Sequence, residues 1–501
     1  MSIAIVYSRA QLGVEAPLVT IEVHLSNGLP SLAIVGLPEA AVKESKDRVR
    51  SAILNSRFEF PLKRITINLA PADLPKQGGR YDLPIALGIL AASDQIPKEN
   101  LIMREFVGEL ALTGELRSIP GVLPFTIAAK NANRPVTLPM ENAEEASLIK
   151  DAIINPAKHL LDVCAHLDQS DVIPEYLPIE RQIEPISTPD LSDVRGQQHA
   201  KRALEIAAAG GHNLLFIGPP GTGKTMLASR LPGILPEMTE EEAIETASIA
   251  SITQNLSTDT WKQRPFRSPH HTTSAVALVG GGSQPKPGEI SLSHNGVLFL
   301  DELPEFDRKV LEVLREPLET GHINISRAAH QARFPASFQM VAAMNPCPCG
   351  YHGDDSGRCR CSPDQIQRYQ SKISGPLLDR IDLHIEVMNV KDSALLDDAP
   401  CGETSETIRQ RVEHARACQL SRRGKSNHLL SEKELTETCK LSDKDKALLQ
   451  SAMQKLNLSA RSINRIRKVS RTIADLENSD QIQTVHLTEA ISYRRLDRNQ
   501  A

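Results

Sequence analysis

The chain has 501 residues, of which 40% are hydrophobic and 24% are charged, and its formal net charge is −5. This length exceeds what one ordinary core holds, so we expect several soluble domains, and the mild charge neither indicates nor excludes nucleic acid, because a binding channel needs only local positive charge. No apolar run reaches the roughly 18–20 residues of a membrane span and no secretory signal is evident, so we expect a cytoplasmic protein without membrane contacts.

The first block of the chain, residues 1–170, alternates strand-like and helix-like runs. Period-two alternation predicts strands at 18–26, 32–38 and 64–71, and helical periodicity predicts helices at 39–56 and 83–92. This pattern indicates an α+β or α/β domain.

A proline-punctuated segment, residues 171–190, follows and reads as a linker, because its prolines disfavour regular helix. Residues 191–390 form a second α/β block with dense motifs. Residues 391–501 are mostly helical and charged, and we predict a helical lid there.

The nucleotide-binding signal is the segment GPPGTGKT, which follows an apolar strand, Leu214–Ile217, and opens a helix. Glycines let backbone N–H groups surround the β-phosphate, Lys224 places a positive charge on the β and γ oxygens, and Thr225 offers its hydroxyl to Mg²⁺. A glycine turn with a chance lysine is the alternative, which the strand–loop–helix context disfavours. We predict ATP and Mg²⁺ as cofactors, with nucleotide contacts from Gly218, Pro219, Pro220, Gly221, Thr222, Gly223, Lys224, Thr225 and Met226.

Polar residues follow two further apolar strands. Val297–Leu300 is followed by Asp301, which we assign to Mg²⁺ together with Thr225, and by Glu302, which we assign to activation of the attacking water. A strand predicted at 339–346 carries Asn345, whose amide can orient that water. The alternative for this asparagine is a turn residue at a strand end, because Asn-Pro favours turns.

These motifs together carry a family resemblance. DVRGQ, GPPGTGKT, LFLDE and MNP resemble an AAA+ ATPase. RSPHHTTS, GGGSQPKPGEISLSHNGVLFLDELPEF, NPCPCG and SGPLLDRIDLHIEV make the chain resemble the magnesium-chelatase-like ComM/YifB family along essentially its whole length. The resemblance implies an ATP-dependent hexameric DNA helicase that promotes branch migration of recombination intermediates during natural transformation. Its implied partners are single-stranded, double-stranded or branched DNA and recombination or transformation proteins.

The resemblance also implies roles outside the phosphate loop. Val194 and Gly196 match the stretch that packs on the adenine. Arg461 matches the second sensor arginine, with three further basic residues nearby on the same predicted helix, Arg465, Arg467 and Lys468.

Arg380, in LLDRID, matches the arginine finger that reaches the ATP of the neighbouring subunit. A planar cation there stabilises the charge of the transition state. A finger that acts in trans needs a ring, so a homohexamer is implied. A simple ion pair with Asp379 or Asp382 is the alternative for this arginine.

Four cysteines, Cys347, Cys349, Cys359 and Cys361, form two Cys-x-Cys pairs. Four thiolates can close a tetrahedral Zn²⁺ site, although this spacing is tighter than the usual Cys-x-x-Cys. Reduced cysteines in a surface loop and a redox dithiol are the alternatives. We favour structural zinc.

The first candidate DNA contacts are Arg327, His330 and Arg333, on two strands predicted at 323–327 and 332–341 and on the short segment that joins them. In the pre-sensor-hairpin branch of AAA+ proteins, such a hairpin projects into the ring channel. Lys286, in a glycine-rich loop, is the second candidate, and phosphate contacts of this kind carry no sequence code. The alternative is that these charged side chains are exposed to solvent and bind nothing. The paired histidines of SPHHTTS are assigned to structure or to the channel, because strand neighbours face opposite sides.

The N-terminal block resembles the proteolytic domain of the Lon family, which has a ribosomal S5 domain 2-like fold. That chemistry needs a serine activated by a lysine, but Arg80 stands at the serine position and Leu123 at the lysine position. We therefore predict a non-catalytic domain that forms a second ring tier around DNA. Lys76 and Arg80 are expected on an exposed loop, contacting DNA or a neighbouring subunit, or paired locally with Asp73 or Asp82.

The predicted fold is α/β multidomain. It comprises a Lon-protease-like α+β domain (1–170), a linker (171–190), an AAA+ P-loop core with magnesium-chelatase-type insertions and the four-cysteine loop (191–390), and a helical lid (391–501). A DNA helicase driven by ATP hydrolysis is the first hypothesis. A magnesium-chelatase-type ATPase that remodels a protein partner is the second, although we expect a chelatase ATPase to resemble only the later part of the chain. The missing dyad disfavours the third, an ATP-dependent protease.

Overall fold

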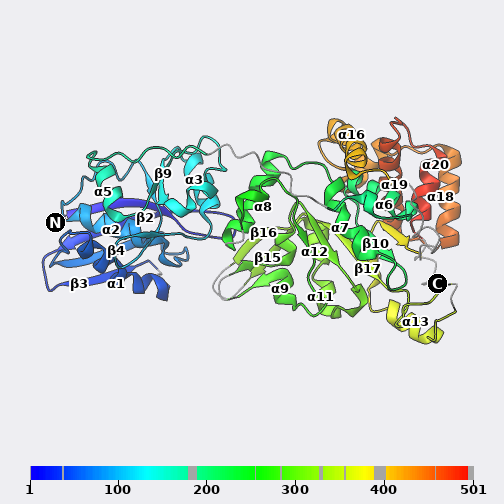
Figure 1. Cartoon of the computed structure of the whole chain (residues 1–501), viewed down its shortest axis with the longest axis horizontal. Coiled ribbons are helices and arrows are strands. Elements are labelled where there is room, and N and C mark those ends of the chain that lie inside the picture. Colours follow the sequence, from blue (N-terminus) through cyan, green and yellow to red (C-terminus); the bar gives the residue numbers. More distant parts are fainter. Residues whose placement is uncertain are drawn as a thin grey trace.

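The computed structural model describes residues 2–36, 39–178, 189–253, 256–282, 285–326, 331–354, 357–388, 402–456 and 458–494. Three parts follow one another along its longest axis: an N-terminal α/β part, a central α/β part and a helical C-terminal part (Figure 1). Within the described ranges, none of the helices combines the length and apolar character needed to cross a membrane.

A seven-stranded sheet, ordered β3-β4-β2-β1-β5-β8-β9, forms the N-terminal part. Alternating burial along β2 (Leu18–Ser26) confirms the strand predicted there, and its antiparallel partner β1 (Ser2–Arg9) is a strand that the sequence reasoning missed. The other strands are β3 (Ser31–Val35), β4 (Arg64–Ala70), β5 (Glu105–Phe106), β8 (Val136–Pro139) and β9 (Ile154–Ala157).

Helices cover this sheet. The helix α2 (Asp82–Ala92) is apolar on all sides and every one of its residues is buried, because it packs on β1 and β2 and is itself covered by α1 (Ala40–Asn55). The observed helices α1 and α2 confirm the helices predicted at 39–56 and 83–92. The remaining helices of this part are α3 (Val122–Asn131), α4 (Ala143–Ala146) and α5 (Leu160–Leu167).

A five-stranded parallel sheet, ordered β11-β14-β17-β10-β18, organises the central part. The predicted apolar strands are confirmed as β10 (Leu214–Ile217), β14 (Val297–Leu300) and β17 (Gln339–Met344), all fully buried as expected for a parallel sheet covered on both faces. The edge strands are β11 (Phe266–Arg267) and β18 (Leu383–Glu386). Because all strands are parallel, their carboxyl ends meet at one edge, where ligands bind in such sheets.

Two small hairpins extend from the central part. One pairs β12 (Gly280–Gly281) with β13 (Lys286–Pro287), and the other pairs β15 (His322–Ser326) with β16 (Gln331–Pro335). The single strand predicted at 332–341 is wrong, because the chain changes partner from the hairpin to the parallel sheet. It turns at 336–338, where Ala336 N–H bonds to the Gly321 carbonyl at 2.8 Å.

The N-terminal and central parts share a hydrophobic cluster. The helix α8 (Glu240–Ile252) packs on α3, and its Ala247 joins residues of both parts in one cluster with Trp261 at its margin. Backbone N–H of Gly121 bonds to the Ser251 carbonyl at 3.0 Å. The two parts are therefore joined by packing as well as by the chain.

The described residues of the C-terminal part contain the α-helices α16 (Ser405–Arg423), α17 (Glu432–Thr438), α18 (Asp443–Leu456), α19 (Ala460–Leu476) and α20 (Thr484–Ser492). α16 packs on the central helices α6 (Gln198–Gly210) and α7 (Lys224–Ile234), and α19 packs on α6. Arg465 of α19 forms an ion pair with the buried Asp382 of the central part. Burial raises the pKa of this aspartate, but the charges and hydrogen bonds of Arg465 and His212 together outweigh burial, and the net shift is downward.

Candidate active site

The phosphate loop connects β10 to α7. A Cβ at Gly218 would lie 2.1 Å from the carbonyl oxygen of Val387, the residue directly after β18, so only glycine fits there. Gly223 has a φ of +85°, in the left-handed region that favours glycine, and it directly precedes the first residue of α7. The local sequence therefore dictates a tight loop that ends at a helix N-terminus, which is a favourable site for phosphate.

Lys224 lies beneath this loop and is 9% exposed. Its Nζ donates to the carbonyl oxygens of Gly218 (2.7 Å) and Pro219 (2.9 Å) and lies 3.2 Å from Asn345 Oδ1. Burial lowers the pKa of this lysine, while the charges of Asp301 and Glu302 raise it. The predicted phosphate-binding lysine and the predicted amide are thus in direct contact.

Oxygen atoms suited to Mg²⁺ lie beside the lysine. Thr225 Oγ1 donates to Asp301 Oδ2 at 2.7 Å, and Asp301 Oδ1 accepts from the Glu302 backbone N–H at 2.9 Å. Hydroxyl and carboxylate oxygens are the ligands that Mg²⁺ prefers, so this donor set fits the metal.

A cavity of about 380 Å³ joins these groups. It is open to solvent between the phosphate loop and the carboxyl ends of β14 and β17. Its lining is Pro220, Gly221, Thr222, Gly223, Lys224, Thr225, Asp301, Glu302, Met344 and Asn345. The sequence-predicted loop, acids and amide are therefore brought together in one site.

Glu302 is held by a contact that the sequence reasoning missed. Its backbone adopts the left-handed conformation (φ 52°), which is uncommon for a residue other than glycine, and its Oε2 lies 3.3 Å from His271 Nδ1. The ring of His271 lies against that of His270, with centroids 4.0 Å apart and the two planes tilted by 34°. These histidines follow β11, and Glu302 follows β14. Because β11 and β14 pair in parallel, the residues after the two strands lie side by side, so this strand pairing would have predicted the contact.

Arg380 and Arg461 do not line this cavity. Arg380 is 5% exposed, donates to the Pro376 carbonyl at 2.6 Å and contacts Glu319. The alternative pairing of Arg380 with Asp379 or Asp382 is wrong. Arg380 forms its ion pair with Glu319, and Asp382 forms an ion pair with Arg465.

A group of positive charges surrounds Arg380. Its pKa is lowered by burial and by the charges of Arg315, Arg461 and Arg465, against the opposing charge of Glu319. Arg461 itself is exposed at the start of α19. Within one subunit, the two predicted phosphate-sensing arginines therefore lie near each other and outside the phosphate-loop cavity.

The stretch predicted to contact adenine lies next to the phosphate loop. The Gln197 side-chain amide donates to the Met388 carbonyl at 2.7 Å and to the Thr222 carbonyl at 3.5 Å. Val194 is buried in the hydrophobic core, and neither it nor Gly196 lines the cavity. Met226 is 45% exposed on the first turn of α7.

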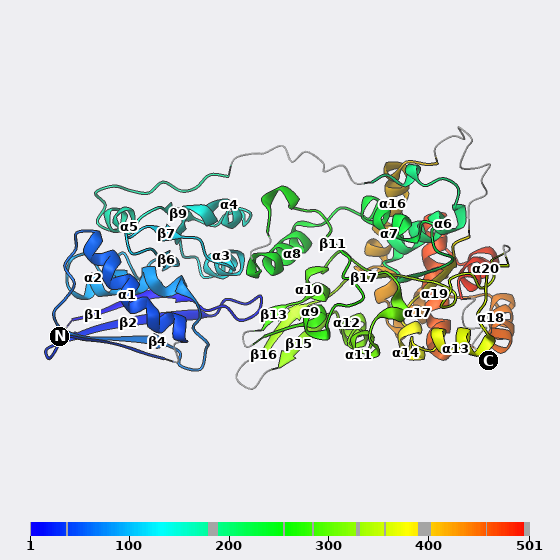
Figure 2. The ribbon, with the colours of Figure 1, turned by 60° about the horizontal axis from the view of Figure 1, so that its bottom comes forward.

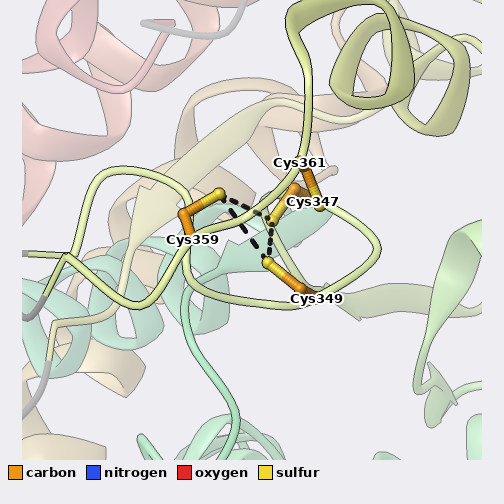
Figure 3. Close-up of side chains that lie close together, drawn as sticks. All are labelled: Cys347, Cys349, Cys359 and Cys361. Atoms are coloured by element: carbon orange, nitrogen blue, oxygen red, sulfur yellow. Dashed lines mark hydrogen bonds between the residues drawn. The ribbon is translucent and has the colours of Figure 1, made fainter.

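The four cysteines form a candidate metal site (Figure 3). Their sulfur atoms all lie within 4.8 Å of one another, and Cys347 Sγ is 3.3 Å from Cys349 Sγ and 3.8 Å from Cys359 Sγ. Tetrahedral bonds of about 2.3 Å place sulfur atoms about 3.8 Å apart, so the cluster fits a Zn²⁺ ion. Hydrogen bonds from the backbone N–H groups of Tyr351 and Arg360 lower the pKa of Cys349 to about 6, which favours its thiolate. Against a backbone hydrogen bond, burial and contacts with neighbouring cysteines raise the pKa values of Cys359 and Cys361.

The cysteine loop supports the phosphate loop. A Cβ at Gly350 would lie 2.7 Å from Pro220 Cδ and 3.9 Å from Asn345 Cγ. The backbone at Gly350 therefore rests directly on the phosphate loop, and a disturbance of the cysteine cluster reaches the nucleotide site through this contact.

We expect Gly350→Ala to weaken ATP binding about tenfold, the equivalent of ~1.4 kcal/mol, because the added methyl group displaces Pro220. Gly353→Ala is the matched control, since Gly353 has a similar φ of +80° and no atom within 4 Å of the added Cβ. Both changes cost about 1–2 kcal/mol for a left-handed alanine. Titration with a fluorescent ATP analogue separates them, and equal ATP affinity in the two variants contradicts the contact.

The candidate DNA contacts are placed only in part. Arg327 and His330 lie outside the described residues. Arg333 is exposed on β16 and contacts His322 of β15, and Lys286 is exposed on β13. Figure 2 shows both hairpins on the side of the central part that faces the N-terminal part.

The expectation that Lys76 and Arg80 are exposed is wrong. Lys76 is fully buried and contacts the Pro71 carbonyl, and Arg80 is 5% exposed. Local pairing of Arg80 with Asp82 is also wrong, because Asp82 accepts from Arg48 at 2.7 Å. The loop is covered from several sides, as the Glu39 N–H bond to the Lys76 carbonyl (3.2 Å) illustrates.

Comparisons with known proteins agree with this site. Three family models match successive parts of the chain: "Subunit ChlI of Mg-chelatase" (21–142), "Magnesium chelatase, subunit ChlI" (190–395) and "Magnesium chelatase, subunit ChlI C-terminal" (402–494). The fold, the site and these matches define a magnesium-chelatase-like AAA+ protein, a class that indicates ATPase activity.

Two full-length relatives narrow the class. Competence protein ComM of Haemophilus influenzae is 58% identical over 503 residues, which cover 99% of this chain and 98% of that protein. Uncharacterized protein YifB of Salmonella typhimurium is 53% identical over 502 residues, with the same coverage. The chain therefore belongs to the ComM/YifB family of magnesium-chelatase-like AAA+ proteins.

The chelatase relationship is more distant and includes the N-terminal part. The magnesium-chelatase 38 kDa subunit of Rhodobacter capsulatus is 25% identical over 226 residues, 40% of this chain and 56% of that protein. A chelatase family model nevertheless matches residues 21–142. The expectation that chelatase likeness is confined to the later part is therefore wrong, and the Lon-protease-like assignment of the first part stays a prediction.

Proposed function

We propose that the protein is an ATP-driven ring translocase that moves the branch point of recombining DNA, as in the integration of DNA during natural transformation. The observation that supports it most is the complete phosphate-loop site in a chain that is 58% identical, end to end, to Competence protein ComM. Its place of action is the cytoplasm, together with recombination or transformation proteins.

Each residue of the site has a task in the proposed hydrolysis. Lys224 and the loop amides would hold the β- and γ-phosphates, and Thr225 and Asp301 would hold a Mg²⁺ ion, which would supply neutralising positive charge at those phosphates. Glu302 accepts the proton of the attacking water, and Asn345 fixes that water in line with the bond that breaks. Val194 and Gly196 lie along the adenine side.

The ring is proposed from the arginines. Because Arg380 and Arg461 lie outside the cavity of their own subunit, a neighbouring subunit is needed to bring an arginine finger to ATP. A homohexamer satisfies this requirement around a central DNA channel. Arg333 and Lys286, with Arg327 and His330 of the same segments, are the proposed phosphate contacts, and N-terminal domains form a second tier.

We also propose that the four cysteines hold structural Zn²⁺. The purified chain is expected to contain about one zinc ion, and Cys349→Ser is expected to lose it and to unfold at a lower temperature. Cys418→Ser, at a free cysteine of α16, serves as the control. Metal analysis decides the question: a wild-type protein without zinc, or a disulfide among these four residues, rejects the structural-zinc assignment.

ATP hydrolysis with and without DNA tests the proposed function. We expect branched or single-stranded DNA to raise the rate of ATP hydrolysis several-fold and Lys224→Ala to remove both the basal and the stimulated rate. A second candidate, remodelling of a protein partner, is favoured by the three matching chelatase models. A rate indifferent to every DNA substrate favours that candidate. ATP-dependent degradation of casein, expected to be absent, would point to a protease.

A further inference from the structure

A second cavity, of about 310 Å³, lies between the N-terminal and central parts. Its N-terminal walls are the loop after β1, the loop before α2 and the segment before α3. Its central walls are the end of α8 and the two small hairpins. The residues that matter here are Gln11, Gly79, Arg80, Glu109, Ser118 and Lys286.

Arg80 is the buried charge of this cavity. Its Nη2 donates to Gln11 Oε1 at 2.5 Å and to the Pro120 carbonyl at 2.8 Å, and both acceptors are neutral. Among the described residues, its Nε and Nη1 form no hydrogen bond and no carboxylate pairs with it. A guanidinium that is 5% exposed and lacks a counter-charge is costly, and an anion in the cavity removes that cost.

The other charged groups on the walls leave a positive balance. Lys286 lines the cavity from β13 of the central part and is exposed. Glu109 is the carboxylate found in the described lining, and it lies against Gly79 and 4.0 Å from Arg117. Two cations therefore face the cavity against one acid that has a partner elsewhere.

Both parts of the molecule build this cavity. The loop after β1 reaches the second hairpin, where a Cβ at Gly13 would lie 3.1 Å from the Arg333 carbonyl oxygen. Arg80 belongs to the N-terminal part and Lys286 to the central part, which also contains the phosphate loop. A ligand that contacts both cations bridges the two parts.

We propose that this cavity binds a phosphate group, with Arg80 as the fixed guanidinium and Lys286 as the second cation from the opposite wall. A planar guanidinium with free N–H groups suits a tetrahedral oxyanion, and a second positive charge favours the dianion of phosphate over a carboxylate. The phosphate comes either from a small phosphorylated ligand or from a DNA backbone. The site does not depend on the proposed motor activity.

Equilibrium dialysis of radiolabelled inorganic phosphate tests the site. The full-length chain is first saturated with ADP and Mg²⁺, so that the phosphate loop is occupied. We expect about one further phosphate per chain, with affinity at least tenfold lower in Arg80→Met and several-fold lower in Lys286→Ala. Lys63→Ala, at an exposed lysine remote from this cavity, is expected to bind as the wild type does.

Two further arms make the outcome decisive. If Arg80→Met does not unfold cooperatively, Lys286→Glu on the exposed hairpin replaces it and is expected to abolish binding. Competition by oligothymidylate assigns the site to a DNA backbone phosphate, and its absence assigns it to a small phosphorylated ligand. No phosphate beyond the phosphate loop, or the same affinity in wild type and Lys286→Glu, overturns the proposal.

Discussion

Replacement of Glu302 by glutamine is expected to lower kcat for ATP hydrolysis by about 10²–10⁴-fold while ATP binding is retained. Glu302 lines the cavity at the end of β14, beside the oxygen pair of Thr225 and Asp301. Glutamine keeps the shape of the side chain but cannot accept the proton of the attacking water. Steady-state hydrolysis and equilibrium ATP binding, measured on the same preparation, separate the two effects.

Glu305→Gln is the matched control for this variant. Glu305 is an exposed neighbour that pairs with Lys372 at 3.3 Å and does not line the cavity. Hydrolysis is expected to be unchanged in this control. A Glu302→Gln protein that still hydrolyses ATP at the wild-type rate rejects Glu302 as the base.

Arg380→Ala and Lys224→Ala are each expected to abolish hydrolysis, and a mixture of the two proteins is expected to recover part of it. In a mixed ring, the intact phosphate loop of an Arg380→Ala subunit meets the intact Arg380 of a Lys224→Ala neighbour. An arginine finger of this kind contributes about 10³–10⁵ in rate, so even a few restored interfaces are measurable. The assay is hydrolysis as a function of mixing ratio at constant total protein.

Arg315→Ala controls for loss of positive charge near Arg380. Arg315 pairs with Glu312 at 2.7 Å and contributes to the field around Arg380 without being the proposed finger. It is expected to remain active. Recovery that is absent at every mixing ratio, with both proteins folded and assembled, places the action of Arg380 within its own subunit.

The nucleotide site was predictable from sequence because its parts have local signals. The phosphate loop is continuous in the chain, and Asp301 and Asn345 each follow an apolar strand directly. Parallel strands bring such ends together at one edge, so residues far apart in sequence were expected to meet. The observed contacts of Lys224 with Asn345 and of Thr225 with Asp301 agree with that expectation.

What escaped prediction depends on contacts between segments that are distant in sequence. The buried position of Arg80 depends on its hydrogen bonds to Gln11 and to the Pro120 carbonyl, and neither residue belongs to a recognisable sequence motif. The contact of His271 with Glu302 requires the pairing of β11, which is a very short strand, with β14. Likewise β1 was missed because its apolar residues, at 3–7, form a short continuous run without polar alternation. The break between β16 and β17 depends on which sheet each strand joins.

ATP-driven conversion of a labelled three-strand DNA junction measures the proposed motor most directly, with Lys224→Ala as the control. The wild-type protein is expected to move the branch point in the presence of ATP and Mg²⁺, and the variant is expected to leave the junction unchanged. A wild-type protein that hydrolyses ATP but never converts the junction contradicts a branch-migration motor acting by itself.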